Sequence, residues 1–332
     1  MGLIFADFPI RGIDVSQFNG KINWTLVNTD FVAIRVGHGR TIDTKFLTNW
    51  QLAKGRVFRI AYWYMDYYSN HNSGSSAYGI SDTEWGRIQA DNCWNQIKGD
   101  RENYVFLDIE NGSSSYSPPI TTVTARAQAI AKAFLERMDS LNGKINGIYC
   151  SLGLLTWFGT WFKDRPLWVA WYNETQTIQT VINAVKGKGW TGRSLMWQYT
   201  SDGDIDDDGI ADGISMGMEY KALDLNAWLG SSSDYSVFIG KEAQVELFKV
   251  KILIYNLLVR SGPGMLYTRL RRANFPGEYS IFEEKNGYGR ISEWKSEWIS
   301  MSPDYVQKIG TKPDPTDAEK LSKLWTAHPE LH

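Results

Sequence analysis

The first two-thirds of the chain alternates short apolar segments with segments of helical pattern. Short, almost continuous apolar runs are typical of parallel strands that are covered on both faces. The clearest helical pattern spans residues 124–141 and is followed by Gly143, and a less regular one spans residues 82–98. Strands are predicted at residues 12–15, 31–36, 59–64, 104–109, 145–150, 167–171 and 195–199. This alternation predicts an α/β fold, either a β/α barrel or an open sheet.

The composition changes near residues 230–234, where GSSSD is a short polar stretch typical of a linker. Beyond it, short alternating strands are separated by Pro-Gly and Asn-Gly turns, which indicate a small all-β unit. The predicted organisation is a barrel over residues 1–230, a linker over 231–243, an all-β domain over 244–310 and a tail over 311–332.

The formal net charge is only -2, so no overall field attracts the chain to nucleic acid or to a membrane surface. The sequence has no apolar run long enough to span a bilayer, and no membrane insertion is expected. The N-terminal segment MGLIFADFPIRGIDVSQ lacks the basic region and long apolar stretch of a signal peptide. We therefore expect a protein made in the host cytoplasm, which needs another protein to reach a target outside the membrane.

The chain has few cysteines and many aromatic residues. Two cysteines, Cys93 and Cys150, are too few for a disulfide framework and lack metal-ligand spacing, so two buried thiols are expected, with one disulfide as the alternative. The aromatic content is high, with 15 Trp, 17 Tyr and 14 Phe residues. Most should be core residues, but Trp and Tyr also stack on flat ligands such as sugar rings.

Four acidic residues are predicted at or near the C-terminal ends of barrel strands. They are Asp14 in RGIDVSQFNG, Asp108 and Glu110 in VFLDIENG, and Asp224 in ALDLN. In a β/α barrel this rim is where active sites are built. Asp108 and Glu110 are two residues apart, so on a strand they project from the same face, roughly 6–7 Å apart at their bases.

Two neighbouring carboxyl groups repel each other, which raises the pKa of one of them and leaves a proton available at neutral pH. Glycoside hydrolysis needs such a pair, because one acid protonates the leaving oxygen while a carboxylate stabilises or attacks the sugar carbon. An isolated D-x-E is also common by chance, and it can cap a strand or form ion pairs. The pair alone leaves both interpretations open.

An ordered set of segments resembles the glycoside hydrolase family 25 lysozymes. The segments are RGIDVSQFNGKINW, FVAIRVG, VFLDIENG, GIYCS, LWVAWY, LMWQYTSDG and LDLNAW, and they cover roughly residues 8–229. These lysozymes are N-acetylmuramidases, common among phage endolysins and bacterial autolysins, with an irregular barrel of eight strands and about five helices. The resemblance implies that fold here, with cleavage of the β-1,4 bond between N-acetylmuramic acid and N-acetylglucosamine in bacterial peptidoglycan, net retention, and no cofactor for catalysis.

The resemblance also implies roles for individual residues. Glu110 would be the general acid, with Asp108, Asp14 and Asp224 as acidic partners. The nucleophile would be either a carboxylate or the acetamido group of the substrate, and in the second case Asp108 would orient that group. Tyr62, Tyr64, Trp171, Tyr172, Trp197 and Tyr199 would line the saccharide groove. His38 and His71 lie in rim loops and are expected to be structural or exposed to solvent.

Residues 250–309 resemble a bacterial SH3 domain. The resemblance depends on residues 258–264, the turn and strand at 286–291, and Trp298-Ile299. Such domains bind the cell wall, and tethering a weak wall-binding module to an enzyme raises the local substrate concentration. The alternative is a stabilising β unit without a ligand. The basic run 269–272 could contact anionic wall polymers or face solvent.

The leading hypothesis is therefore a peptidoglycan hydrolase of the endolysin type, released through a holin pore. One alternative is a non-catalytic protein that binds cell wall or carbohydrate, but such a binder has no need for an Asp-x-Glu pair. The other is a glycosidase that acts on another amino-sugar polymer such as chitin, which the SH3-like segment disfavours.

The segment SDGDIDDDGIADG, residues 201–213, has a spacing typical of calcium loops. Asp204, Asp206, Asp208, the carbonyl of Ile210, and Asp212 match positions 1, 3, 5, 7 and 9 of such a loop. The acid that would close a complete EF-hand is missing, because position 12 is Ser215, although Glu219 or water could replace it. We expect a structural Ca²⁺ with no part in the chemistry, and the alternative is a solvated acidic turn.

Overall fold

The computed structural model describes residues 4–100, 104–112, 118–241, 246–292 and 295–309; the predicted tail, residues 311–332, lies outside this part of the chain. The contacts divide the chain into two compact units, Met1–Ser231 and Ser232–His332. Within the described ranges, no helix is both long enough and apolar enough to cross a bilayer.

The first unit contains a closed barrel of eight strands, which confirms the predicted fold class. The strands are β1 (Arg11–Val15), β2 (Phe31–His38), β4 (Phe58–Tyr64), β5 (Val105–Asp108), β6 (Gly147–Ser151), β7 (Leu167–Ala170), β8 (Ser194–Thr200) and β9 (Asp224–Trp228). Seven strands follow one another in parallel, and β1 pairs with β2 to close the ring. The short strand β3 (Thr41–Ile42) extends β2 outside the ring.

The barrel is irregular at β9, which runs antiparallel to both of its neighbours, β8 and β1. Its first residue, Asp224, therefore lies at the same rim as the C-terminal ends of the seven parallel strands. The sequence prediction placed Asp224 near the end of a strand; the structure places it at the start of a reversed one. The reversal brings Asp224 directly opposite Asp14 in the strand register.

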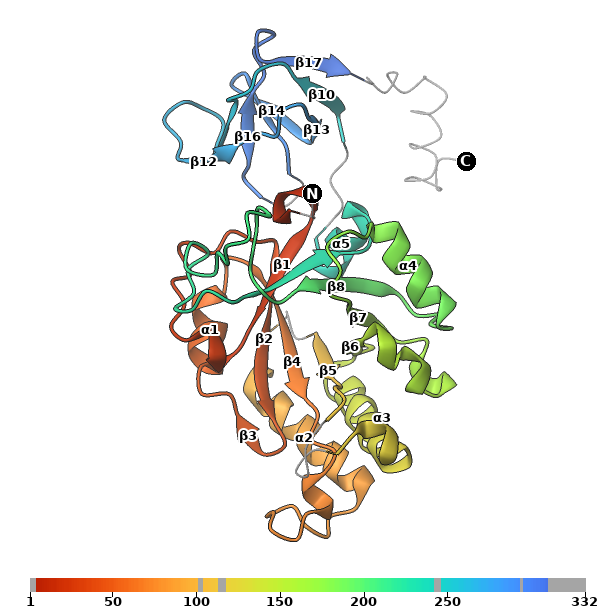
Figure 1. Cartoon of the computed structure of the whole chain (residues 1–332). Helices are drawn as coiled ribbons and strands as arrows, with labels where there is room; N and C mark the ends of the chain where they lie inside the picture. The colour runs from red at the N-terminus through yellow and green to blue at the C-terminus, as the bar shows by residue number, and fades with distance from the viewer. Residues whose placement is uncertain (1–3, 101–103, 113–117, 242–245, 293–294, 310–332) are drawn as a thin grey trace, which may run out of the picture. The chain divides into compact units, whose positions relative to one another are not determined.

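Four α-helices lie outside the strands of this unit (Figure 1). They are α1 (Phe46–Ala53), α2 (Asp82–Ile97), α3 (Thr124–Asn142) and α4 (Ile178–Gly187). The helix α3 ends at Gly143, whose φ of 67° is the left-handed conformation that glycine adopts readily. The connection between β6 and β7 contains two short 3₁₀ helices, η5 (Leu152–Trp157) and η6 (Thr160–Phe162), in place of an α-helix.

Aromatic side chains fill the interior of the barrel. The ring of Trp168 lies 4.5 Å from that of Tyr149 and 6.0 Å from that of Phe106. Gly147 on the neighbouring strand β6 leaves space for the Phe106 ring, because a Cβ at this position would come within 2.3 Å of that ring. The interior of the barrel is therefore packed with aromatic rings.

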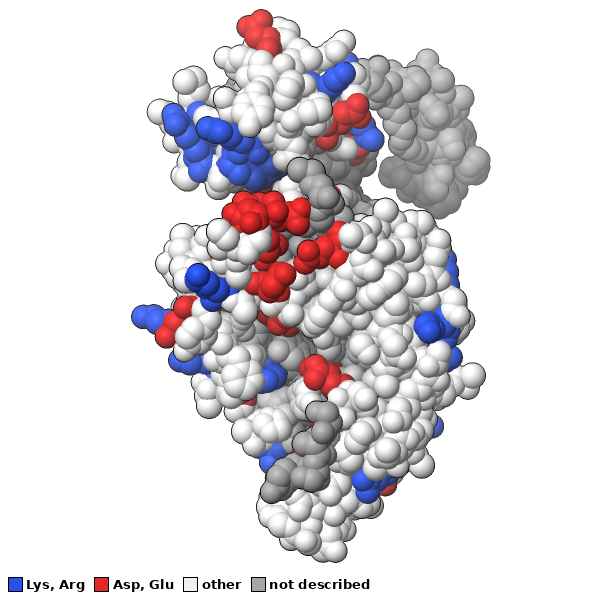
Figure 2. Space-filling model, in the orientation of Figure 1, with Lys and Arg blue, Asp and Glu red and all other residues white. Residues whose placement is uncertain are grey.

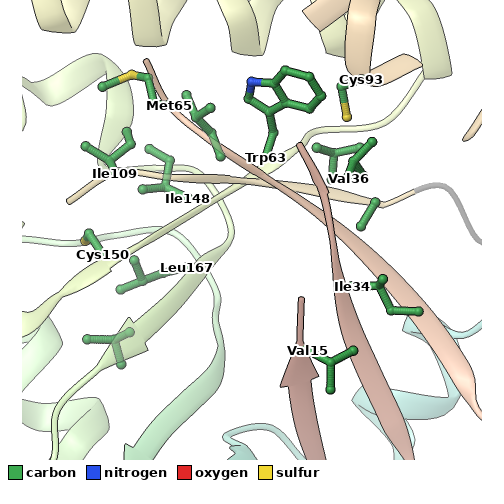
Figure 3. Packing of buried hydrophobic residues seen from close by; sticks show 14 of the residues in the cluster. Val15, Ile34, Val36, Trp63, Met65, Cys93, Ile109, Ile148, Cys150 and Leu167 are labelled. Atoms are coloured by element: carbon green, nitrogen blue, oxygen red, sulfur yellow. The ribbon is translucent and has the colours of Figure 1, made fainter. Parts of the chain in front are cut away.

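A second apolar layer lies between the strands and the helices. Figure 3 shows Val15, Ile34, Val36, Trp63, Met65, Cys93, Ile109, Ile148, Cys150 and Leu167 in this layer. Cys93 and Cys150 are both buried and both free, which confirms the prediction of two buried thiols over that of a disulfide. Burial raises the pKa of both thiols well above the usual range, so neither is a reactive thiolate.

The second unit contains α5 (Ser232–Phe238) and two small antiparallel sheets of strand order β13-β10-β17 and β12-β11-β16-β15-β14. The strands are β10 (Phe248–Ile252), β11 (Leu258–Arg260), β12 (Arg269–Arg272), β13 (Glu278–Ile281), β14 (Glu283–Lys285), β15 (Tyr288–Arg290), β16 (Trp298–Ser300) and β17 (Val306–Ile309). Positive φ angles at Asn286 and Gly287 form the tight turn between β14 and β15. The helix α5 lies in the stretch predicted as a linker, which is therefore not an extended connection over these residues.

Candidate active site

A cavity of about 460 Å³ opens at the rim where the seven parallel strands end. Its walls are formed by Asp14, Ser16, Phe18, Arg35, His38, Tyr62, Tyr64, Asp108, Glu110, Tyr149, Trp168, Tyr172, Gln198 and Asp224. All four acids predicted from the sequence are among them. On the face of this unit seen in Figure 2, Asp and Glu side chains gather in one band, while Lys and Arg lie mainly at its margins.

The fold brings these acids together from distant parts of the chain. Asp14 is on β1, Asp108 is the last residue of β5, and Asp224 is the first residue of β9. Glu110 lies two residues beyond the end of β5. Asp14 and Asp108 are buried, each 5% exposed, whereas Glu110 is exposed at the mouth of the cavity. The site therefore has buried carboxyl groups at its base and an accessible one at its entrance.

Asp14 and Asp224 form a hydrogen-bonded pair of carboxyl groups. Burial raises the pKa of Asp14 to about 6, although three side-chain hydrogen bonds oppose the rise. Burial, and then the negative charge of Asp14, raise the pKa of Asp224 to about 9. Two carboxyl groups can share a hydrogen bond only when one of them is protonated. At neutral pH the pair therefore holds one proton.

Asp108 and Glu110 both have raised pKa values, chiefly because the surrounding protein removes solvation, completely around Asp108 and in part around Glu110. For Asp108 the next cause is the charge of Glu110, followed by that of Asp14. The Oδ1 atom of Asp108 is buried and has no hydrogen-bond partner. A buried polar atom without a partner costs free energy, so this oxygen is available to a hydrogen-bond donor on a ligand.

Arg35 on β2 lines the cavity together with these acids. Its charge opposes the rise in pKa of both Asp108 and Glu110. Its Nε atom forms an ion pair with Asp43 at 2.8 Å, and its guanidinium lies 4.8 Å from the centre of the Phe18 ring. Arg35 was not among the site residues predicted from the sequence. A charged residue inside the apolar strand FVAIRVG was the available signal, since burying a charge requires a partner or a function.

Three of the six predicted groove aromatics line the cavity, namely Tyr62, Tyr64 and Tyr172. The other three are not among its lining residues: the predictions for Trp197 and Tyr199 were wrong, and the one for Trp171 stays a prediction. Trp197 and Tyr199 are completely buried in the outer layer, and Trp171 packs against it. Strand residues alternate between faces, and a similar division continues just past the end of β7, where Tyr172 lines the cavity and Trp171 packs against the outer layer. The same alternation directs Gln198, and not its neighbours Trp197 and Tyr199, toward the cavity.

The sequence analysis did not assign a site role to several other lining residues: Ser16, Phe18, His38, Tyr149, Trp168 and Gln198. The period of two along β7 was the available signal for Trp168, because it predicts one face for Trp168 and Tyr172. His38 was expected to be structural, and it contributes to the wall. Phe18 is 70% exposed, which is unusual for an aromatic ring, so it offers an apolar surface at the entrance.

The predicted calcium loop is partly assembled. Carboxylate oxygens of Asp204, Asp206 and Asp208 lie within 4.8 Å of one another. Two oxygens bound to one Ca²⁺ at about 2.4 Å are at most about 4.8 Å apart, so the three carboxylates fit that ion. Asp212 lies outside this group and accepts a hydrogen bond from the backbone N–H of Ile205 at 3.3 Å.

The alternative closing ligand, Glu219, has a partner outside the loop. Its carboxylate accepts a hydrogen bond from the backbone N–H of Lys21 at 2.6 Å. Of the four predicted carboxylate ligands, three are therefore gathered. A calcium site that also includes the carbonyl of Ile210 stays a prediction.

Comparison with known proteins gives a family match and a distant relative. Residues 13–208 match the sequence profile of the glycosyl hydrolases family 25. The uncharacterized protein YegX of Escherichia coli O157:H7 is 23% identical over 261 residues, which cover 73% of this chain and 74% of YegX.

Solved structures share the fold of the barrel unit. A family 25 glycosyl hydrolase from Bacillus anthracis has a TM-score of 0.50 at 16% identity, covering 71% of this chain and 96% of its own. A muramidase from Acremonium alcalophilum has a TM-score of 0.50 at 20% identity, covering 69% and 98%. The autolysin LytC of Streptococcus pneumoniae, in complex with a synthetic peptidoglycan ligand, has a TM-score of 0.50 at 19% identity, covering 66% and 46%.

Proposed function

This chain belongs to glycosyl hydrolase family 25, and we propose that it cleaves the β-1,4 bond between N-acetylmuramic acid and N-acetylglucosamine in bacterial peptidoglycan. The chain is a glycoside hydrolase by its family. The observation that supports the finer assignment is the cavity in which four carboxyl groups with raised pKa values meet beside Tyr62, Tyr64 and Tyr172. Aromatic side chains can stack on sugar rings, and a protonated carboxyl group can donate its proton to the glycosidic oxygen.

Glu110 is the proposed general acid. Its side chain lies at the mouth of the cavity, and the site raises its pKa, so that it keeps its proton to a higher pH than a free glutamic acid does. In the first step this proton moves to the glycosidic oxygen as the bond to the sugar carbon breaks. The resulting carboxylate of Glu110 then removes a proton from the water that completes hydrolysis.

Asp108 is proposed to stabilise the positive charge that develops at the sugar carbon. Its Oδ1 atom has no partner in the protein, so it can accept a hydrogen bond from the acetamido N–H of the substrate. That contact would orient the acetamido oxygen for attack on the sugar carbon, whereas direct attack by Asp108 would form a covalent ester. Both routes use two displacements and predict net retention. Mass spectrometry of enzyme treated with a 2-fluoro glycoside separates them, since only direct attack adds the sugar's mass.

The test of the muramidase proposal compares wild type with Glu110→Gln on purified peptidoglycan. We expect wild type to clear the suspension and to release products with a reducing N-acetylmuramic acid end. The Gln variant should lose about 10²–10⁴-fold in rate, the usual contribution of a general acid. Glu84→Gln is the matched control, because Glu84 is exposed on α2 and its ion pair with Arg87 is long, at 3.9 Å.

Three outcomes would contradict this proposal. A wild type that binds walls without clearing them would indicate a non-catalytic binder. Cleavage of chitin in preference to peptidoglycan would indicate another amino-sugar substrate. A reducing N-acetylglucosamine end on the products would indicate a glucosaminidase.

For the C-terminal unit we propose a bacterial SH3-like role in wall binding. Support comes from its two small sheets around a core that includes Val250, Val259, Ile281 and Ile299. Its edge strand β12 presents exposed Arg269 and Arg272. Exposed cations on an edge strand prevent unwanted strand pairing, and they can also attract anionic wall polymers.

The endolysin role is a further proposal, and it depends on the resemblance to endolysins in both parts of the sequence. In that role the protein is released to the wall through a holin pore. Induction of the chain in a susceptible bacterium, with and without a co-expressed holin, tests it. We expect lysis only with the holin, and rapid lysis without it would exclude holin-dependent release.

A further inference from the structure

Asp14 is hydrogen-bonded to groups that favour one of its protonation states over the other. Its Oδ2 atom accepts hydrogen bonds from Asn226 Nδ2 at 2.7 Å and from Gln198 Nε2 at 2.9 Å. Its carboxyl group is also hydrogen-bonded to that of Asp224. Because one oxygen already accepts two N–H donors, the ionised form of Asp14 is strongly favoured by geometry.

The orientation of the Asn226 amide is determined by its second contact. Trp168 Nε1 lies 2.7 Å from Asn226 Oδ1, inside the barrel. An indole N–H can only donate a hydrogen bond. The oxygen of the amide must therefore face Trp168, and its amino group must face Asp14. Asn226 is completely buried, so no water competes for either contact.

The Gln198 amide is held in a similar way by two hydroxyl groups. The Tyr149 hydroxyl donates to Gln198 Oε1 at 2.6 Å, and the Tyr172 hydroxyl donates to the same atom at 2.9 Å. The side chain of Gln198 is 3% exposed. With its oxygen occupied by two donors, its amino group is directed to Asp14, so both amides present donors to the same carboxylate oxygen.

We propose that Gln198 and Asn226 are positioning residues that hold Asp14 in its ionised form. The single proton of the acid pair consequently resides on Asp224, which donates it to Asp14. The catalytic consequence of this arrangement rests on the proposed hydrolase function. The base of the site then carries one fixed negative charge, on Asp14, and Asp224 adds no second negative charge near Glu110. Trp168, Tyr149 and Tyr172 maintain this arrangement through their hydrogen bonds to the two amides.

Other charged and titratable groups also face this pair. They are Asp108 and Glu110 from β5 and its following loop, Arg35 from β2, Tyr62 from β4, Tyr149 from β6, and Tyr172 beyond β7. When ionised, Asp108 and Glu110 destabilise the anion of Asp14, and Arg35 favours the ionised forms of Asp108 and Glu110. The two amides are thus neutral donors that favour the anion without adding a charge to the site.

The experiment follows the carboxyl ¹³C resonances of Asp14 and Asp224 by NMR in the full chain labelled at aspartate. In wild type at pH 7 we expect an ionised Asp14 and a protonated Asp224. Gln198→Met and Asn226→Leu each remove one donor, so the midpoint of Asp14 should rise by about one pH unit or more, a tenfold change in proton affinity. The acid limb of the kcat/KM profile should shift by the same amount.

Gln89→Met is the matched control for packing. Gln89 is also completely buried, and it bridges Trp63 and Asp66 away from the acid pair. We expect it to lower the melting temperature while leaving both titrations unchanged. A protonated Asp14 in wild type at pH 7, or an unchanged midpoint in both donor variants, would overturn the inference. If wild type does not cleave peptidoglycan but titrates as expected, the proton placement stands and the proposed function fails.

Discussion

At the scale of the residue, four carboxyl groups of similar intrinsic acidity acquire different properties from their surroundings. Asp14 accepts two amide donors, whereas Asp224 holds a proton and hydrogen-bonds to it. Asp108 is buried with an oxygen that has no partner, and Glu110 lies at the mouth of the cavity. Residue type alone does not distinguish these roles, because burial and neighbours determine each pKa.

The raised pKa of Asp224 predicts that stability falls as the pH rises. An aspartate in the unfolded chain loses its proton near pH 4, whereas folded Asp224 keeps its proton to about pH 9. Between these values the folded state binds more protons, so the free energy of unfolding decreases with pH, by at most about 1.4 kcal/mol per unit for one proton. Thermal melts from pH 5 to 9 should show a falling midpoint in wild type.

Asp224→Asn is the variant that isolates this effect. Its amide can still donate to Asp14 but does not titrate, so the decline of the midpoint with pH should be shallower than in wild type. Identical slopes for the two proteins would show that Asp224 has no raised pKa in the folded state.

At the scale of the element, the alternation of strand residues separates the site from the outer core. On β8, Gln198 faces the cavity while Trp197 is completely buried in the layer between strands and helices. Trp197 also donates from its indole nitrogen to the carbonyl of Trp171 at 2.8 Å. Neighbouring residues on β8 therefore have different roles, because one face of the strand contributes to the candidate active site and the other contributes to stability.

This division predicts opposite phenotypes for two aromatic substitutions. Trp197→Ala should lower the free energy of unfolding by about 3–5 kcal/mol, because it leaves a large cavity in the core. Tyr64→Ala should keep the melting temperature and raise KM about fivefold, equivalent to about 1 kcal/mol of lost aromatic contact. Urea denaturation and peptidoglycan kinetics measure the two effects. A stable Trp197→Ala protein with a raised KM would reverse the assignment of faces.

The aspartate loop between β8 and β9 is predicted to gain stability from Ca²⁺. With three carboxylates able to contact one ion, EDTA should lower the melting temperature and added Ca²⁺ should restore it by mass action. Asp206→Asn should reduce this dependence. Asp234→Asn is a control of the same chemistry outside the loop. A midpoint that is the same with EDTA and with Ca²⁺ would indicate a solvated acidic turn.

At the scale of the whole molecule, the chain joins a barrel unit to a small β unit. The barrel holds every residue of the described cavity. The C-terminal unit has its own apolar core, so its contribution to activity can be separated from the chemistry. Its proposed function is to raise the local concentration of substrate.

Removal of residues 232–332 should therefore affect insoluble and soluble substrates differently. We expect clearance of intact walls to fall about tenfold or more, as expected when a tether is lost. Turnover of soluble peptidoglycan fragments should change little. Near-ultraviolet circular dichroism of the shortened chain verifies that the barrel is folded. Equal losses on both substrates, in a folded barrel, would argue against a wall-binding role.

Much of the architecture could be predicted from the sequence, because it depends on local patterns. Period and composition predicted the parallel strands, the helix α3 and the change to an all-β unit. The order of motifs predicted the four acids of the cavity. These signals are local: each depends on a few neighbouring residues and on the backbone conformation they favour.

The tertiary structure alone decided which residues meet. The reversal of β9 brings Asp224 opposite Asp14, although 210 positions separate them in the chain. The amides that orient this pair come from β8 and β9, and their partners come from β6 and β7. Strand direction and pairing are properties of the closed barrel, whereas a sequence pattern specifies only the local period. Proton placement depends on such contacts, so it follows from the fold and not from the residue types.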